Sequence, residues 1–328
     1  MKTACLRTLL ICQLLLGGPL VGGSRTVAWG DETTSVPAAP PATTPPAADP
    51  APSDSAVLLG ELLEPLAARP GTATQPAGEA ELYARPLPLL EALQRSGDTS
   101  RRLWIAHAYW KVSAAYAAVR CCTEAIERLE MIAPGGDRHD RATLDVATAA
   151  AKADLADARA HLGGMQQELV DLARLPLGEP LPWPVDRPLA GPYQTHFDAI
   201  FANRTATGRV RAIARTLPAR HEALESRAAA VRAAATAMAM AEADHAKGQR
   251  PIEAVIAAHA ALVSQQREFL QATKAYNLDI AEYAMAVADL SVPDDRFVSM
   301  LIGTPIQWRQ TPPATSPPAP ATSGTLVP

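Results

Sequence analysis

The feature that most constrains the fold is an apolar stripe in residues 252–290, whose members recur at alternating spacings of three and four. The stripe runs without a slip through Ile252, Val255, His259, Leu262, Gln266, Phe269, Thr273, Tyr276, Ile280, Tyr283, Val287 and Leu290. A period of 3.5 residues is typical of a helix that supercoils left-handedly around a partner. Further apolar residues one position along, such as Ile256, Val263 and Leu270, widen the stripe. We therefore expect this helix to have more than one neighbour.

Three other segments carry similar stripes and complete two helical pairs. They cover residues 99–133, 137–175 and 217–247. The links 134–137 and 247–251 are short and contain glycine, and each ends on an Asp or Pro that can start a helix. A short link forces successive helices to lie antiparallel. The sequence therefore predicts an all-α fold with two long antiparallel coiled-coil hairpins, 99–175 and 217–290.

The segments around the hairpins differ in composition. Residues 55–97 contain two short helical candidates, 55–68 and 78–95, and a proline-rich crossover, 175–193, joins the hairpins and leads into a helix over 194–215. We expect Trp183 and Tyr193 to dock this crossover onto the long helices, the alternative being a ligand site. The Pro/Ala-rich stretches 29–54 and 310–328 predict disordered spacers, the second closing a C-terminal segment, 296–328. Residues 296–308 are the nearest candidate for a strand.

The first residues predict an export signal over 1–28. Lys2 and Arg7 flank its start, and an apolar run follows over 8–21. This run is shorter than the roughly 20 residues of a membrane span, although an uncleaved N-terminal anchor is the alternative. We therefore expect an exported protein, in the periplasm or associated with the outer membrane. Removal of this signal would take Cys5 and Cys12 with it and leave only Cys121 and Cys122. We expect these two to pack as small apolar residues, the alternative being a partner-linked or metal-binding thiol pair.

The motifs of catalysis and cofactor binding are missing from the sequence. There is no HExxH, paired-cysteine motif or glycine-rich phosphate loop, so we expect no enzymatic activity, no cofactor and no metal. The alternative for the metal is a site assembled from Glu and His side chains of different helices. The chain is 20% charged with a net charge of -4, and this balance does not mark a nucleic-acid surface.

Several polar residues on the predicted helices have two interpretations. His259 and Gln266 stand in the apolar stripe, where they either set the register or line a polar tunnel. His221 and Glu225 share a helix face as a surface pair. A basic cluster, Arg204, Arg209, Arg211 and Arg215, is either a solvated face or a contact for an acidic partner.

Residues 246–288 resemble the outer-membrane efflux factors of the TolC family. Gly248 resembles the family's turn glycine, and residues 252–255 (IEAV) stand where the family has a Leu-Asp-Val-Leu type of sequence. Tyr276-Asn277 and Tyr283 match its downstream aromatic positions. Residues 215–231 resemble the helix that enters this hairpin, and residues 134–140 resemble the turn of the first repeat. The resemblance covers about 101–290.

The resemblance implies a trimer whose hairpins form a periplasmic tunnel and whose turns meet an adaptor protein. By this likeness the adaptor-facing tip residues are Gly135, Gly136, Asp137, Gly248, Gln249, Arg250 and Glu253. The family also shares an outer-membrane barrel, but we expect none here, because the sequence lacks four alternating strands of about 9 to 11 residues.

We accordingly interpret residues 98–295 as a TolC-like helical domain that forms or supports an efflux or export assembly. The alternative is a periplasmic coiled-coil scaffold or spacer that transports nothing.

Overall fold

The structure is a computed structural model that describes residues 53–63, 85–133, 137–288 and 291–302, which all belong to one unit comprising residues 50–328. These residues are mostly helical, which confirms the predicted all-α class. The expected signal (1–28), most of the linker (29–52) and the C-terminal tail (303–328) lie outside the described residues. The elements are α1 (Asp54–Leu63), β1 (Arg85–Leu87), α2 (Leu89–Ser96), the 3-10 helix η3 (Thr99–Arg101), α3 (Arg102–Met131), α4 (Arg138–Ala173), β2 (Pro182–Pro184), α5 (Phe197–Ile200), α6 (Gly208–Ala246), α7 (Ile252–Val287) and α8 (Asp294–Leu301).

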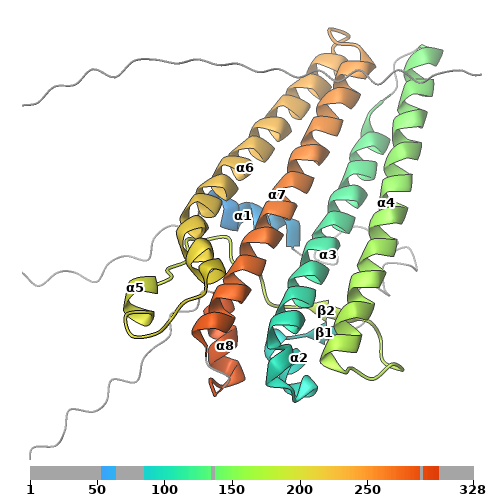
Figure 1. Ribbon diagram of the computed structural model, residues 1–328. Helices are drawn as coiled ribbons and strands as arrows, with labels where there is room; N and C mark the ends of the chain where they lie inside the picture. Colours follow the sequence, from blue (N-terminus) through green and yellow to red (C-terminus); the bar gives the residue numbers. More distant parts are fainter. Residues whose placement is uncertain (1–52, 64–84, 134–136, 289–290, 303–328) are drawn as a thin grey trace, which may run out of the picture. The chain divides into compact units, whose positions relative to one another are not determined.

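Four long helices lie side by side in the order α6, α7, α3, α4 (Figure 1). Helix α7 packs along both α6 and α3, while α4 packs mainly along α3. The stripe on α7 is buried from Ile252 to Tyr283, so the expectation of more than one neighbour is confirmed. Phe269 and Tyr276, in the middle of the stripe, are almost inaccessible to solvent.

Helix α3 is buried over much of its circumference. It lies between α7 and α4 and also contacts α1, α2 and β2. Its aromatic side chains Tyr109, Trp110 and Tyr116 are among the largest that are fully buried. Aromatic side chains bury more apolar area than the alanines that dominate α4 and α6, so the core concentrates around α3 and α7.

The proline-rich crossover is tied to α3 by a tyrosine hydroxyl. Tyr109 donates to the Leu87 carbonyl (2.9 Å) and to Asp186 (2.8 Å). The Val185 and Asp186 backbone N–H groups donate to the same oxygen at 3.1 and 3.0 Å. Asp186 in turn accepts from the Leu89 backbone at the start of α2 (2.7 Å). These contacts fix β1 beside β2, with Leu87 opposite Pro184 in parallel register.

Three further contacts hold the crossover on the long helices. The Asn277 side chain exchanges two hydrogen bonds with the backbone of Leu189, each 2.8 Å long. The Trp183 ring lies 3.9 Å from that of Tyr116, and Tyr193 lies edge-on to Tyr283 with centroids 6.1 Å apart. The prediction that Trp183 and Tyr193 dock this segment is therefore confirmed.

The structure corrects the predicted boundary between the helix over 194–215 and the third long segment. Residues 208–246 form one helix, α6, with Pro218 inside it, and the stretch before it holds only the short α5. A proline removes one hydrogen bond and crowds the preceding turn. The helix nevertheless continues because Ile213, Leu217 and Leu224 on both sides of the proline are buried.

Two shorter predictions also differ from the structure. The helix expected over 78–95 begins only at Leu89, because β1 precedes it, and residues 78–84 lie outside the described residues. The strand candidate over 296–308 is helical in its described part, which belongs to α8. There Phe297 and Leu301 are buried, and α8 packs on α7 and α2.

We predict that Phe269→Ala lowers the free energy of unfolding by about 3–5 kcal/mol, because it leaves a cavity in the shared stripe of α7. Urea denaturation followed by circular dichroism measures the change. Gln271→Ala, at an exposed position on the same helix, should shift stability by about 0.5 kcal/mol or less. Equal effects of the two substitutions would contradict the assignment of the core.

Candidate functional site

The first group of predicted tip residues lies at the start of α4. Asp137 caps this helix, and its carboxylate accepts a hydrogen bond from the His139 backbone N–H (3.1 Å). Capping satisfies one of the N–H groups that a helix leaves unpaired at its beginning. Gly135 and Gly136, which were predicted with it, lie outside the described residues.

The second group forms the link between α6 and α7. Gly248 has a φ of 71°, a left-handed conformation that favours glycine. Its N–H donates to the His245 carbonyl (2.8 Å), and the Gln249 N–H donates to the Asp244 carbonyl (2.9 Å). The Arg250 guanidinium lies 3.3 Å from the Asp244 carboxylate. These bonds terminate α6 and reverse the chain within a few residues.

One contact joins the two groups of tip residues. The His139 Nε2 atom on α4 lies 2.8 Å from Glu253 Oε1 on α7. The backbone N–H of Glu253 and the His139 ring hold the pKa of this carboxyl below its ordinary value. The structure thus brings the beginnings of α4 and α7 together. His139 was not among the predicted tip residues, because its partner is 114 positions away.

Below these helix ends, a groove of about 320 Å³ runs between α4 and α7 over α3. Arg267 on α7 reaches across it to Asp154 on α4 (2.5 Å), and one of its nitrogens lies 3.8 Å from the Cys122 sulfur. Cys121 and Cys122 are both buried and free, and burial raises the pKa of Cys121 to about 12. Because a protonated thiol is a poor nucleophile and metal ligand, this burial favours the packing interpretation for Cys121.

A buried histidine belongs to the same region. His259 in the stripe of α7 is 6% exposed, and its Nε2–H donates to the Ala125 carbonyl of α3 (3.0 Å). Burial lowers its pKa, because charging the ring there removes it from water. A hydrogen bond between neighbouring helices is what a register-setting residue requires.

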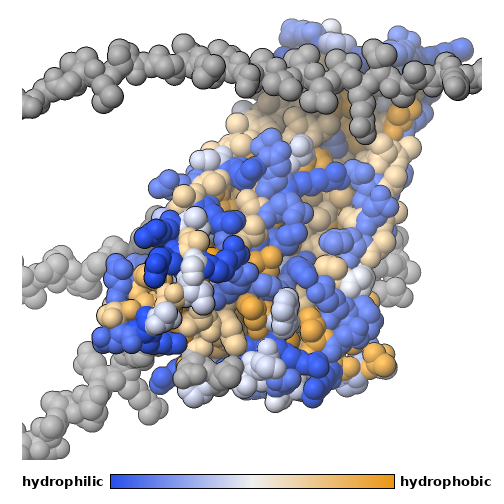
Figure 2. All heavy atoms as spheres, in the orientation of Figure 1, coloured by the Kyte–Doolittle hydropathy of each residue, from blue (hydrophilic) through white to orange (hydrophobic). Residues whose placement is uncertain are grey.

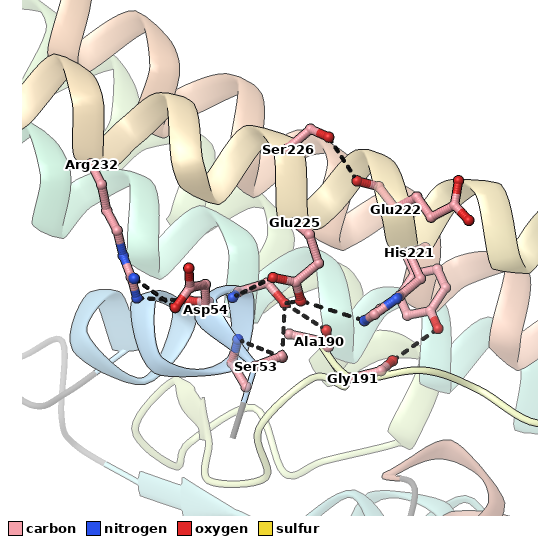
Figure 3. Close-up of polar contacts among 12 residues, drawn as sticks. Ser53, Asp54, Ala190, Gly191, His221, Glu222, Glu225, Ser226 and Arg232 are labelled. Atoms are coloured by element: carbon pink, nitrogen blue, oxygen red, sulfur yellow. Dashed lines mark hydrogen bonds and ion pairs between the residues drawn. The ribbon is translucent and has the colours of Figure 1, made fainter. Parts of the chain in front are cut away.

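A polar cluster connects α1 to α6 (Figure 3). The Ser55 hydroxyl lies 2.6 Å from Glu225 Oε1 and 2.7 Å from the Ala190 carbonyl oxygen. His221 lies one turn before Glu225, with its Nε2 3.5 Å from the same carboxylate oxygen. Next to this cluster, Arg232 pairs with Asp54 at 2.6 Å. The predicted surface pair, His221 and Glu225, is therefore part of a contact between distant segments.

The cluster contains a serine, a glutamate and a histidine, but their order does not match a catalytic triad. In a triad the histidine contacts the serine and the carboxylate orients the histidine. Here Glu225 stands between Ser55 and His221. Ser55 is also fully buried, so a substrate has no access to its hydroxyl. The arrangement suits a fastening of α1 onto α6 and the crossover.

A buried carboxylate lies further along α7. Asp279 is 5% exposed and lies 2.7 Å from Arg220 and 3.3 Å from Arg209, both on α6. Burial raises the pKa of Asp279, and the two arginines offset part of that increase. Nearby on α3, burial lowers the pKa of His107. Sequence reasoning missed this group because its members come from three separate helices.

The chain matches no protein-family model, no curated protein and no solved structure. Within the described ranges, no helix combines the length and the apolar character that crossing a membrane requires. In the same ranges, no three His, Cys, Asp or Glu side chains gather in a way that could hold a metal ion. The candidate site is therefore defined by its own geometry, as two adjacent helix ends that present polar groups.

We predict that Ser55→Ala weakens the attachment of α1 by about 1–3 kcal/mol, because it removes the buried hydroxyl that bonds the buried Ala190 carbonyl and the partly exposed Glu225 carboxylate. Hydrogen exchange of the α1 amides measures the change. Val57→Ala, at an exposed position in α1, is the matched control. Unchanged exchange in Ser55→Ala would show that the hydroxyl does not hold the helix.

We predict that His259 makes the protein less stable in mild acid. Its pKa in the folded protein lies below the ordinary value, so the unfolded chain takes up the proton first. The stability that the neutral His259 ring allows is fully present above about pH 6.5, the ordinary pKa of histidine. It is lost as the pH falls towards the lower pKa that His259 has in the folded protein.

Replacing His259 by glutamine should reduce the loss of unfolding free energy between about pH 7.5 and 5.5, measured by urea denaturation. The control variant His161→Gln, at an exposed site on α4, should lose as much unfolding free energy over this pH range as the wild type does. An identical pH dependence in His259→Gln and the wild type would refute the prediction.

Proposed function

We propose that the chain is a TolC-like cell-envelope protein that forms or supports an efflux or export assembly. In this proposal α3 with α4, and α6 with α7, are antiparallel coiled-coil hairpins within a helical domain of residues 98–295. The sequence resemblance over residues 246–288 supports it, and so does the arrangement of the long helices in one row (Figure 1). The assignment is to an interaction protein rather than an enzyme.

The burial pattern supports the coiled-coil interpretation. Every position of the 3-4 stripe from Ile252 to Tyr283 is buried, which covers most of the 36-residue helix α7. On α6 the buried positions include a series spaced seven residues apart, Leu217, Leu224, Val231 and Met238. This is the heptad period that favours supercoiling of two helices along a shared seam.

The observation that carries the proposal is that each of the two outer helices of the row packs against a long helix on one side only. Helix α4 packs mainly on α3, and α6 packs mainly on α7. Each outer helix exposes a large apolar residue, Val146 on α4 and Met240 on α6, which are 71% and 60% accessible. A contact between the α4 flank of one copy and the α6 flank of the next would be heterologous, and such a contact builds a ring when its repeated rotation closes.

The adjacent helix ends supply the second part of the proposal. The beginnings of α4 and α7 are joined by His139 and Glu253, and the α6–α7 link lies beside them. In a ring of copies these ends would repeat around one rim. Asp137, Gly248, Gln249, Arg250 and Glu253 would then form the surface that meets an adaptor protein, as the resemblance implies.

We predict that the purified full-length protein is a trimer in light scattering coupled to size-exclusion chromatography. Val146→Asp or Met240→Asp should shift it towards the monomer, because each places a charge in an apolar contact between copies. Leu177→Asp, in the 82% exposed crossover position, is the control. A wild-type monomer at all concentrations would refute the assembly.

Co-purification separates transport from a purely structural role. The proposal expects an adaptor protein to be retained by the wild type and lost in Glu253→Arg, which reverses the charge at the helix ends. The scaffold alternative expects no adaptor and normal export after deletion of the gene.

A further inference from the structure

The structure divides the basic cluster at the start of α6 into two pairs of arginines. Arg204 donates to the Val287 carbonyl at the end of α7 (3.2 Å) and lies over the Phe201 ring. Arg209 bonds the Glu282 carboxylate at 2.7 Å and also approaches Asp279. Both of these arginines therefore have partners within the chain, and they support the packing of α7.

The second pair, Arg211 and Arg215, is different. Among the described residues neither has a carboxylate within ion-pair distance, and both are exposed. They line one side of a groove of about 750 Å³, whose other side is the segment 195–199. Figure 2 shows strongly hydrophilic side chains gathered over the beginning of α6 and around α5. Asp198 is the one acidic residue that lines this groove.

The position of these arginines on α6 is electrostatically unfavourable. The beginning of a helix carries partial positive charge from its unpaired N–H groups, and cations are disfavoured there. Helix α6 begins at Gly208 and has no acidic residue in its first turn. Arg211 stands in this first turn, and Arg215 adds a second positive charge one turn further on, so an anion in the groove would offset both charges.

The opposite wall of the groove is held in place. The Tyr283 hydroxyl donates to the Thr195 carbonyl, and the Phe197 and Phe201 rings pack 4.8 Å apart. His196, between Thr195 and Phe197 in the chain, has a φ of 45°, a conformation that a residue with a side chain adopts at some cost. A fixed wall lowers the entropy lost when a ligand binds.

We propose that this groove binds a phosphate group carried by a small ligand, with Arg211 and Arg215 as its principal contacts. Residues four apart on a helix face the same direction, about one turn apart, so two guanidinium groups can meet one phosphate. The planar guanidinium fork matches two phosphate oxygens. The groove is within the size range of small-molecule sites. The phosphate comes either from a soluble ester or from a phospholipid headgroup.

Calorimetric titration of the full-length protein with pyrophosphate tests the site. The double variant Arg211→Gln/Arg215→Gln should bind roughly tenfold more weakly or worse, since each lost charge-assisted bond has a substantial effect. Arg159→Gln, an exposed arginine on α4, should bind as the wild type. Equal weakening in this control, or undiminished binding in the double variant, would overturn the proposal.

A second variant tests the site without removing an arginine. Ala214→Asp places a carboxylate in the groove lining next to both guanidinium groups, and it should abolish binding while thermal unfolding shows an intact fold. Arg211→Lys/Arg215→Lys keeps the charge but loses the planar fork, and should bind with intermediate affinity. Wild-type binding by Ala214→Asp would contradict the location of the site.

Vesicle sedimentation then identifies the source of the phosphate. Binding to phosphatidylglycerol vesicles that disappears in the double variant assigns a lipid headgroup, with phosphatidylcholine vesicles as the control. Pyrophosphate binding without sedimentation assigns a soluble phosphate ester. Absence of both would refute a phosphate site in this groove.

Discussion

The apolar stripe of α7 is the contact on which the arrangement of the other helices depends. Its side chains are shared by α6 on one flank and α3 on the other, and Phe269 and Tyr276 at its centre are almost fully buried. Helices α4 and α6 are rich in alanine, and an alanine side chain buries less apolar area than an aromatic side chain does. They are therefore held mainly through the neighbours that α7 and α3 provide.

Polar contacts determine how the remaining segments attach to this row. The Tyr109 hydroxyl forms hydrogen bonds with both the crossover and β1, and the Asn277 side chain holds the crossover on α7. Ser55 fastens α1 to Glu225, 170 positions further along the chain. Ser55, Tyr109 and Asn277 are themselves buried, so losing a partner would leave a buried polar group without a hydrogen bond, which is costly. Polar residues thus specify positions that apolar packing alone leaves open.

Charge is distributed unevenly along the same row. At one end, the contact between the His139 ring and the Glu253 carboxylate joins the beginnings of α4 and α7. Towards the other end of α7, Glu282 and Asp279 bond Arg209, while Arg211 and Arg215 keep no carboxylate partner among the described residues. The two proposed contacts accordingly lie at different ends of the row, the protein contact at one end and the anion contact at the other.

The heptad period by itself determined the helical class, the long helices and their links, because side chains that repeat every 3.5 residues have one buried face whatever the partner. It did not determine that α6 continues through Pro218, since burial on both sides of that residue outweighs its local preference. Only the tertiary structure paired His139 with Glu253. It also showed that Arg209 has a carboxylate partner, whereas Arg211 has none among the described residues. Such pairings join residues tens of positions apart, and they depend on the packing angles of helices rather than on any local pattern.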